Sequence, residues 1–238
     1  METTRDSRQP VGRPRRRVRT PGGFTLPDLL MVVGCLAVLI AVLVPLLGRM
    51  RSNARRTQCI ANLQQVNRAV LGYAHEHSGR LPLVTNVMKT TWWHYKELVK
   101  GQLGLVGTSS PRDRVFACPD DRGYDEAGPF YKSAKFDYQS YNFNGVNLPG
   151  MPNIAGREVS SVKYPARTLL TMEWTAHAPL SWHDSRTGRQ NHPFYNNALN
   201  VVGFVDGHVK YIPIHYDGIN AAYTRDPVGG YEYKYSGD

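Results

Sequence analysis

Acidic and histidine side chains that could carry acid–base or metal chemistry lie in the last third of the chain, near the pair Asp206-Gly207. If the fold gathered them, four further side chains could complete a catalytic or ligand cluster: His183, Asp184, His192 and His208. The sequence contains no G-x-S-x-G nucleophile elbow, no phosphate-binding loop and no G-x-G-x-x-G dinucleotide motif. Glu97 and Glu173 are isolated in sequence, so they give no pair of carboxylates for general acid–base catalysis. We therefore predict that the chain is not an enzyme.

The Asp206-Gly207 pair also has a structural interpretation. It lies between two segments of alternating apolar residues, 201–205 and 208–212, and an Asp-Gly pair in that setting is a strong signal for a β-hairpin. A two-residue turn would place Phe204 opposite Val209 and give the hairpin one apolar face. We therefore predict a hairpin turn here rather than a ligand or catalytic site.

Two further groups of residues could bind a metal. Four acids could form a calcium-binding loop: Asp120, Asp121, Asp125 and Glu126. Gly123 alone does not supply the spacing of an EF-hand, so calcium is an alternative to the expectation that the chain needs no cofactor. Neither Cys59 nor Cys118 belongs to a C-x-x-C pair, and we therefore predict no zinc site.

An apolar run near the N-terminus has the length of a membrane helix. Leu29 to Gly48 is twenty residues without a charge, and a helix needs about 20 residues to cross a ~30 Å hydrocarbon core. Seven arginines precede the run within residues 1–23 and four follow soon after it, so the positive-inside rule favours a cytoplasmic N-terminus. A secretory signal peptide would have a shorter apolar region and a small-x-small cleavage site, which the end of this run lacks. A plain signal anchor stays open as an alternative.

The helical pattern continues beyond the apolar run. Apolar residues recur at three- and four-residue intervals, as in an amphipathic helix: Ile60, Leu63, Val66, Val70 and Tyr73. The segment 78–82, Ser-Gly-Arg-Leu-Pro, supplies a stop signal. We expect an α+β fold, in which one long N-terminal helix packs its outer half on an antiparallel β-sheet head. The pattern assigns no strands to residues 85–140, and we expect the polar, tyrosine-rich segment 229–238 to be mobile.

The cysteines carry information about the compartment. If the head is translocated, Cys59 and Cys118 face an oxidising environment, in which disulfides persist. Their pairing would close a loop of about 60 residues and, in the chain-entropy model, would stabilise the fold by around 4 kcal/mol. Two buried thiols are the alternative. Cys35 lies in the apolar run, where an unpaired thiol packs as a small hydrophobic group.

The formal net charge of +10 is unevenly distributed. Residues 1–23 carry seven arginines against two acids, a sum of +5, so the other 215 residues also sum to +5. Nucleic-acid binding needs basic residues clustered on the folded part of a protein. The basic residues that cluster here adjoin the apolar run instead: Arg49, Arg51, Arg55, Arg56 and Arg68. We therefore expect no nucleic-acid partner.

The segment Gly23-Phe24-Thr25-Leu26-Pro27-Asp28 resembles the N-terminal signal of type IV prepilins and type II secretion pseudopilins. In that family a short basic leader ends in Gly, Phe usually follows, and an acid, normally Glu, is the fifth residue after the cut. The resemblance implies cleavage between Gly23 and Phe24 by a membrane-embedded prepilin peptidase, followed by N-methylation of Phe24. Asp28 is the fifth residue from Phe24, and Pro45 stands where these proteins often have a proline that kinks the helix. Pro27, and Asp in place of Glu, depart from the family pattern.

Asp28 is the residue to which the resemblance gives a role in assembly. A carboxylate inside an apolar helix is costly unless it is paired, so an intramembrane acid is a functional candidate. The implied partner is the freed N-terminal amine of a neighbouring subunit. Such a pair would set the register in which the helices stack into a filament.

The head carries a second resemblance. The segments 59–66 (Cys-Ile-Ala-Asn-Leu-Gln-Gln-Val) and Cys118-Pro119 are similar to segments of bacterial prepilin-like proteins that end in a domain with an H-x9-D-G pattern. Three later segments follow in the order of that family: 140–144, 164–168 and 200–208. Asn196 stands ten residues before Asp206, where the family has its histidine, so no role of that histidine carries over.

Together these features predict a pilin- or pseudopilin-like structural subunit of a type II secretion pseudopilus or a type IV pilus-like filament. Its expected parts are a leader at 1–23, a transmembrane helix at 24–48, an amphipathic extension at 49–78 and a head at 79–238. We expect a single-pass protein of the bacterial inner membrane, with its head in the periplasm or outside the cell. Its expected partners are prepilin peptidase, other pilin-like subunits and the inner membrane. The alternative is a non-polymerising, membrane-anchored extracytoplasmic binding protein.

Overall fold

The computed structural model describes residues 22–86, 89–123, 128–146, 150–177, 180–184, 195–216 and 226–238. The chain divides into two compact units, residues 1–47 and 48–238. Helix α1 (Leu26–Glu76) begins in the first unit, where every described side chain is exposed. Among the described residues, α1 is the one helix long and apolar enough to cross a membrane.

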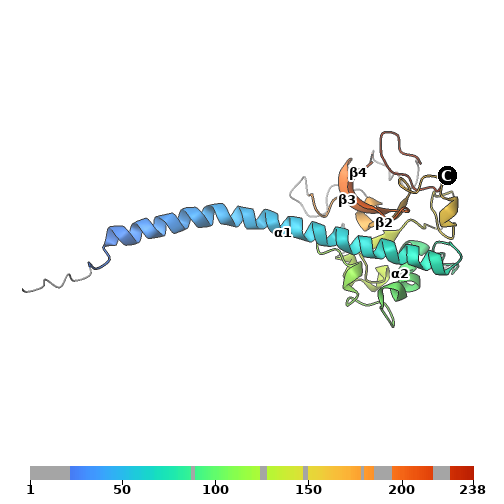
Figure 1. Cartoon of the computed structure of the whole chain (residues 1–238), viewed down its shortest axis with the longest axis horizontal. Coiled ribbons are helices and arrows are strands. Elements are labelled where there is room, and N and C mark those ends of the chain that lie inside the picture. The colour runs from blue at the N-terminus through green and yellow to red at the C-terminus, as the bar shows by residue number, and fades with distance from the viewer. Residues whose placement is uncertain are drawn as a thin grey trace, which may run out of the picture. The chain divides into compact units, whose positions relative to one another are not determined.

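In the second unit, α1 buries one face against a core. Its buried apolar residues recur at intervals of three and four, which places them on one side of the helix: Cys59, Leu63, Val66, Val70 and Ala74. They belong to the same core as Tyr141, Val201 and Val205 of the sheet region. Figure 1 shows this part of α1 running beside strands β2 (Leu169–Glu173) and β3 (Ala198–Phe204). The periodicity in the sequence therefore marks the face that packs.

The sheet has four short antiparallel strands in chain order: β1 (Tyr141–Phe143), β2 (Leu169–Glu173), β3 (Ala198–Phe204) and β4 (Val209–Ile214). All five residues of the central strand β2 are buried, because both faces of the sheet are covered. Pro213 lies in β4, an edge strand, where a missing N–H interrupts no ladder. The fold is therefore α+β, with a long apolar N-terminal helix and a small antiparallel sheet.

A second helix, α2 (Thr91–Val99), lies in the region to which the sequence pattern assigned no strands. The Thr90 side chain accepts a hydrogen bond from the backbone N–H of Trp92 and so caps the helix start. Tyr95 and Val99, four residues apart, join the core beneath α1. Short 3₁₀ turns rather than strands make up most of the remaining regular structure between α2 and β1.

The C-terminal segment 226–238 covers the other face of the sheet. Tyr233 and Tyr235 are buried there against Leu169, Phe204 and other residues of a second apolar core. The backbone N–H of Leu169 donates to the carbonyl of Lys234 at 2.9 Å, which ties the segment to β2. The expectation of a mobile tail was wrong, because its tyrosines supply the large apolar surface that this face needs.

The structure places Asp206 and Gly207 in the predicted turn between β3 and β4, but the register differs from the prediction. Gly203 rather than Phe204 pairs with Val209. The N–H of Phe204 donates to the carbonyl of His208 at 2.9 Å, so the turn holds three residues and not two. Gly207 has φ +96°, as the last position of such a three-residue turn requires. A slip of one residue exchanges the cross-strand partners, and the predicted pairing was therefore wrong.

Candidate functional site

The predicted processing junction lies just before α1. Gly23 and Phe24 precede Leu26, the first helical residue, and the Phe24 side chain is 84% exposed. The peptide bond between Gly23 and Phe24 is thus in non-helical chain that a protease can enter. Residues 1–21 of the predicted leader lie outside the described residues.

Asp28 caps the start of α1. Its Oδ2 atom accepts hydrogen bonds from the backbone N–H of Thr25 at 3.0 Å and from the Thr25 hydroxyl at 2.6 Å. This is the carboxylate half of a capping box, in which an acid in the first turn satisfies the N–H of the residue before the helix. Pro27 fits the same turn, because the first N–H groups of a helix have no partner within it. The two departures from the prepilin pattern therefore both suit a helix start at this position.

Cys59 and Cys118 form a disulfide, the first of the two states expected for them. Their Cα atoms lie 4.8 Å apart, and both side chains are fully buried. The amide of Asn62, one turn along α1, donates to the carbonyl of Ala117 at 2.8 Å. The backbone N–H of Cys118 donates to the Ser140 hydroxyl at 2.9 Å. The bond thus joins α1 to the loop before β1, within a set of buried polar contacts.

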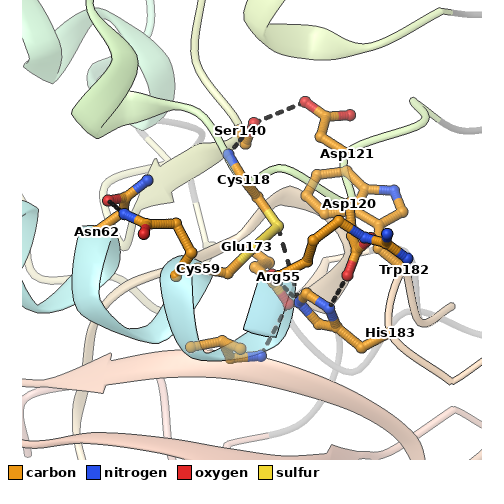
Figure 2. Close-up of a disulfide and its surroundings, with 12 residues drawn as sticks. Arg55, Cys59, Asn62, Cys118, Asp120, Asp121, Ser140, Glu173, Trp182 and His183 are labelled. Carbon is orange, nitrogen blue, oxygen red and sulfur yellow. Dashed lines mark hydrogen bonds and ion pairs between the residues drawn. A yellow bond between two sulfur atoms is a disulfide. The ribbon is translucent and has the colours of Figure 1, made fainter. Parts of the chain in front are cut away.

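A histidine flanked by two carboxylates lies beside the disulfide (Figure 2). The His183 ring contacts Oδ2 of Asp120 through Nδ1 at 2.9 Å and Oε1 of Glu173 through Nε2 at 2.8 Å. Nε2 also lies 3.8 Å from the sulfur of Cys118. Arg55, on α1, pairs with the other oxygen of Asp120. Two basic and two acidic side chains therefore neutralise one another in this cluster.

Burial and charge act in opposite directions on His183. Burial of the ring favours its neutral form, but the charges and hydrogen bonds of Glu173 and Asp120 outweigh this and raise the pKa of His183 to about 9. Burial likewise favours the neutral form of Asp120, but the hydrogen bonds from His183 and Arg55 outweigh it and lower the pKa of Asp120. At neutral pH the ring is therefore a protonated, buried donor to both carboxylates.

Asp121 turns away from this cluster. Its carboxylate accepts hydrogen bonds from the Ser140 hydroxyl at 2.7 Å and from the backbone N–H of Gly123 at 2.8 Å. Burial raises the pKa of Asp121 to about 6 despite these bonds. Asp120 and Asp121 thus serve different partners within the chain, and the remaining acids of the suggested calcium loop, Asp125 and Glu126, lie outside the described residues.

The structure does not gather the cluster suggested around Asp206. Asp206 and His208 bond to each other in the exposed hairpin turn. The N–H of Asp184 donates to the Ser181 hydroxyl, while His183 joins Asp120 and Glu173. His192 lies outside the described residues. The expectation that Glu173 is isolated was wrong, because its carboxylate pairs with His183, which also contacts Asp120.

Asn196, which stands where the prepilin-like proteins that the sequence resembles have a histidine, has a structural role. Its side-chain oxygen accepts hydrogen bonds from the backbone N–H of Tyr216 at 2.8 Å and from the Tyr231 hydroxyl at 3.2 Å. These contacts join the start of β3 to the residues after β4 and to the C-terminal segment. Asn196 thus ties together three stretches of chain at this end of the sheet.

The cluster also contains a set of potential metal ligands. One ligand atom from each of four residues lies within 4.8 Å of the others: Cys59, Cys118, Glu173 and His183. The two sulfurs are bonded to each other, and a metal binds thiolates rather than a disulfide. In the disulfide form, therefore, only Glu173 and His183 of this set carry charge, and they belong to the buried ionic network with Asp120 and Arg55.

Two polar arrangements thus stand out among the described residues: the Thr25–Asp28 cap at the start of the apolar helix and the buried network around His183. Both are held by hydrogen bonds or ion pairs within the chain. No protein-family model, curated protein or solved structure matches the chain.

Proposed function

We propose that this chain is a pilin- or pseudopilin-like structural subunit. A prepilin peptidase cuts it after Gly23 and methylates the new amine of Phe24. Its apolar helix then packs with the helices of like subunits in a type II secretion pseudopilus or a type IV pilus-like filament. The chain works through assembly and carries out no chemistry of its own.

The observation that carries the proposal is the acid at the start of an exposed apolar helix. Asp28 lies in the first turn of α1, four residues after Phe24, and the side chains that follow it up to Gly48 are exposed in the isolated chain. An apolar surface of this extent needs lipid or neighbouring helices around it. A carboxylate at its start offers a polar contact to a neighbour's N-terminal amine.

Two further features support the proposed placement. The arginine-rich residues 1–23 favour a cytoplasmic N-terminus, which places the head in the periplasm or outside the cell. The Cys59–Cys118 disulfide fits such an oxidising compartment. We therefore propose a single-pass protein of the bacterial inner membrane.

One observation favours the alternative, an anchored extracytoplasmic binding protein that does not polymerise. The Asp28 carboxylate accepts both hydrogen bonds of the helix cap from Thr25 of the same chain. A carboxylate satisfied within its own helix has less need of a neighbouring amine. The two functions are separated by experiments on processing and on helix contacts.

Processing is tested by intact mass and N-terminal sequencing of the protein from cells with and without an active prepilin peptidase. We expect a mature chain that begins at methylated Phe24 only when the peptidase is active. Gly23→Val should block the cut, while Gly22→Val is the matched control and should be cut. A chain that keeps residues 1–23 in cells with active peptidase would refute the proposal.

Assembly is tested through Cys35, the free thiol on the exposed part of α1. A membrane-permeant bismaleimide should link subunits through Cys35, or through single cysteines introduced at Leu36, Ala37 or Val38 in a Cys35→Ser background. These four positions cover one helical turn, so at least one of them should face a neighbouring subunit. A missing crosslink at a single position therefore does not count as evidence for a monomer. Asp28→Asn should reduce the links and Asp28→Glu should keep them. If the processed chain forms no crosslink at any of these positions, the alternative holds: the protein is membrane-anchored and does not polymerise.

A further inference from the structure

The disulfide and its neighbours hold the ligand types of a tetrahedral metal site. Two sulfurs, an imidazole nitrogen and a carboxylate oxygen lie within 4.8 Å of one another. In a zinc site with metal–ligand bonds of 2.0–2.3 Å, neighbouring ligand atoms are roughly 3.3–3.8 Å apart. The 3.8 Å between Cys118 Sγ and His183 Nε2 already matches this spacing. Two contacts keep the set from that arrangement: the bond between the two sulfurs and the 2.8 Å hydrogen bond between Nε2 of His183 and Oε1 of Glu173, which a bound metal would replace.

Hydrogen bonds from neighbouring groups orient the two ligands that are not sulfurs, His183 and Glu173. Asp120 contacts Nδ1 of His183 and so directs Nε2 toward the sulfurs, as Figure 2 shows. This carboxylate–histidine contact is the support that metal-bound histidines usually have. The backbone N–H of Val201 donates to Oε2 of Glu173 at 2.8 Å, which leaves Oε1 facing Nε2. Arg55 in turn holds Asp120.

We propose that reduction of the Cys59–Cys118 disulfide turns this cluster into a binding site for a tetrahedral divalent cation such as Zn²⁺. The ligands are the two cysteine sulfurs, Nε2 of His183 and Oε1 of Glu173. Asp120 is a positioning residue that keeps the imidazole in the correct orientation. The site is closed by four protein ligands, so its role is structural.

The chemistry requires a dithiol reductant. The dithiol gives two electrons and two protons to the disulfide: the S–S bond breaks, each cysteine becomes a thiol, and the reductant becomes a disulfide. The metal then displaces both thiol protons and the proton on Nε2, which pass to solvent. A metal crosslink between Cys59 and Cys118 thereby takes the place of the covalent one.

A hollow in the surface lies next to the residue that carries one of the buried sulfurs. A hollow of about 350 Å³ opens beside Cys118 and is lined also by Gln58, Asn62 and Tyr131. Cys118 is the cysteine that also contacts His183. A small reductant and a metal ion in this hollow therefore lie close to Cys118, and they reach its buried sulfur when the surrounding loop opens.

Cobalt titration tests the site in the full-length chain in detergent. A Cys35→Ser background removes the third cysteine, so all thiols seen after reduction come from the proposed site. The protein is reduced with dithiothreitol, freed of it by anaerobic gel filtration and titrated with Co²⁺. We expect thiolate-to-cobalt charge-transfer bands and the strong visible bands of a tetrahedral ion, saturating at one ion per chain and lost when Zn²⁺ is added. The oxidised protein should show none.

Variants separate this site from binding by two free cysteines. His183→Gln and Glu173→Gln should remove the tetrahedral spectrum, and Asp120→Asn should weaken Co²⁺ binding by about 10- to 100-fold. His75→Gln alters an exposed histidine on α1 and should leave the titration unchanged. Equal binding by His183→Gln would overturn the ligand set, as would the absence of bands in reduced protein that keeps its near-ultraviolet circular dichroism. X-ray absorption of the zinc-loaded parent protein must show two sulfur and two nitrogen or oxygen neighbours, whether or not the variants fold.

Discussion

The side chain of Asn67, on α1, occupies the space that a side chain at Gly203, on β3, would need. A Cβ atom on residue 203 would lie 2.7 Å from Oδ1 of Asn67. The same amide donates to the carbonyl of Phe204 at 2.9 Å and accepts from the Thr171 hydroxyl at 2.9 Å. One buried side chain thus joins the helix to two strands, and the missing Cβ of Gly203 makes this contact possible.

Gly203→Ala should therefore destabilise the head by about 1–3 kcal/mol, because the added methyl group must displace Asn67 or the strand. The four tryptophans all lie in the second unit, so urea unfolding followed by tryptophan fluorescence reports on the head alone. Gly101→Ala is the control, since a Cβ there meets no atom within 4 Å. Equal unfolding midpoints for the two variants would contradict the role of the close contact.

His183→Gln should lower the free energy of unfolding by about 3–5 kcal/mol, because it removes the cation from between two carboxylates and leaves Glu173 buried without its charged partner. The exposed His75→Gln should change the same urea transition by less than about 0.5 kcal/mol. A small effect of His183→Gln would mean that the network contributes little to folding.

Stability should fall as the pH rises through the range in which His183 titrates. The pKa of His183 is raised from 6.5 to about 9 on folding, so the folded state keeps a proton that the unfolded chain has lost. The stabilisation is complete below pH 6.5 and is lost as the pH passes 9, a change of about 3 kcal/mol. Urea unfolding between pH 6 and 9.5 should show this loss in the parent chain and a flatter curve in His183→Gln. Parallel curves would rule out His183 as its source.

Replacing both Cys59 and Cys118 by serine should destabilise the head by about 4 kcal/mol, since it frees a loop closed over a sequence separation of 59 residues. Cys35→Ser should leave the head transition unchanged, because that thiol is exposed and lies in the first unit. The measurement is urea unfolding without reductant and without added metal. Loss of the same stability on reduction of the parent chain would assign the effect to the bond itself.

Tyr233→Ala should lower the free energy of unfolding of the head by about 3–5 kcal/mol, as the removal of other large aromatic side chains from a core does. Tyr233 is fully buried in the second core, and its hydroxyl accepts a hydrogen bond from the N–H of His215 at 3.0 Å. The half-exposed Tyr164 gives the matched control, Tyr164→Ala, with a much smaller effect. If Tyr233→Ala and Tyr164→Ala unfold at the same urea concentration, the C-terminal segment does not close the second core.

The parts of the fold that local pattern determines were predictable. The apolar run and the three- and four-residue spacing of Leu63, Val66 and Val70 indicate α1 and its buried face. The Asp206-Gly207 pair indicates the hairpin between β3 and β4. The exact cross-strand partners depend on one extra residue in the turn, which composition alone does not specify.

The network around His183 could not be found from sequence, because its members meet only through the topology. Asp120 lies 63 residues before His183, and Glu173 lies at the end of a strand whose neighbours position it. No short motif links them, so each residue resembles an ordinary surface charge. The burial of the C-terminal tyrosines could not be predicted for a related reason. The apolar face that they cover is assembled from three strands, β2, β3 and β4.

The burial of Tyr235 has a consequence for the order of events during synthesis. Its ring and the neighbouring backbone close the core over Leu169 and Phe204, residues made much earlier. Until Tyr235 has left the ribosome and packed against these residues, that face of the sheet stays open to solvent and to other chains. The head therefore completes its folding only after its last tyrosines arrive, and it has to be guarded against aggregation until then.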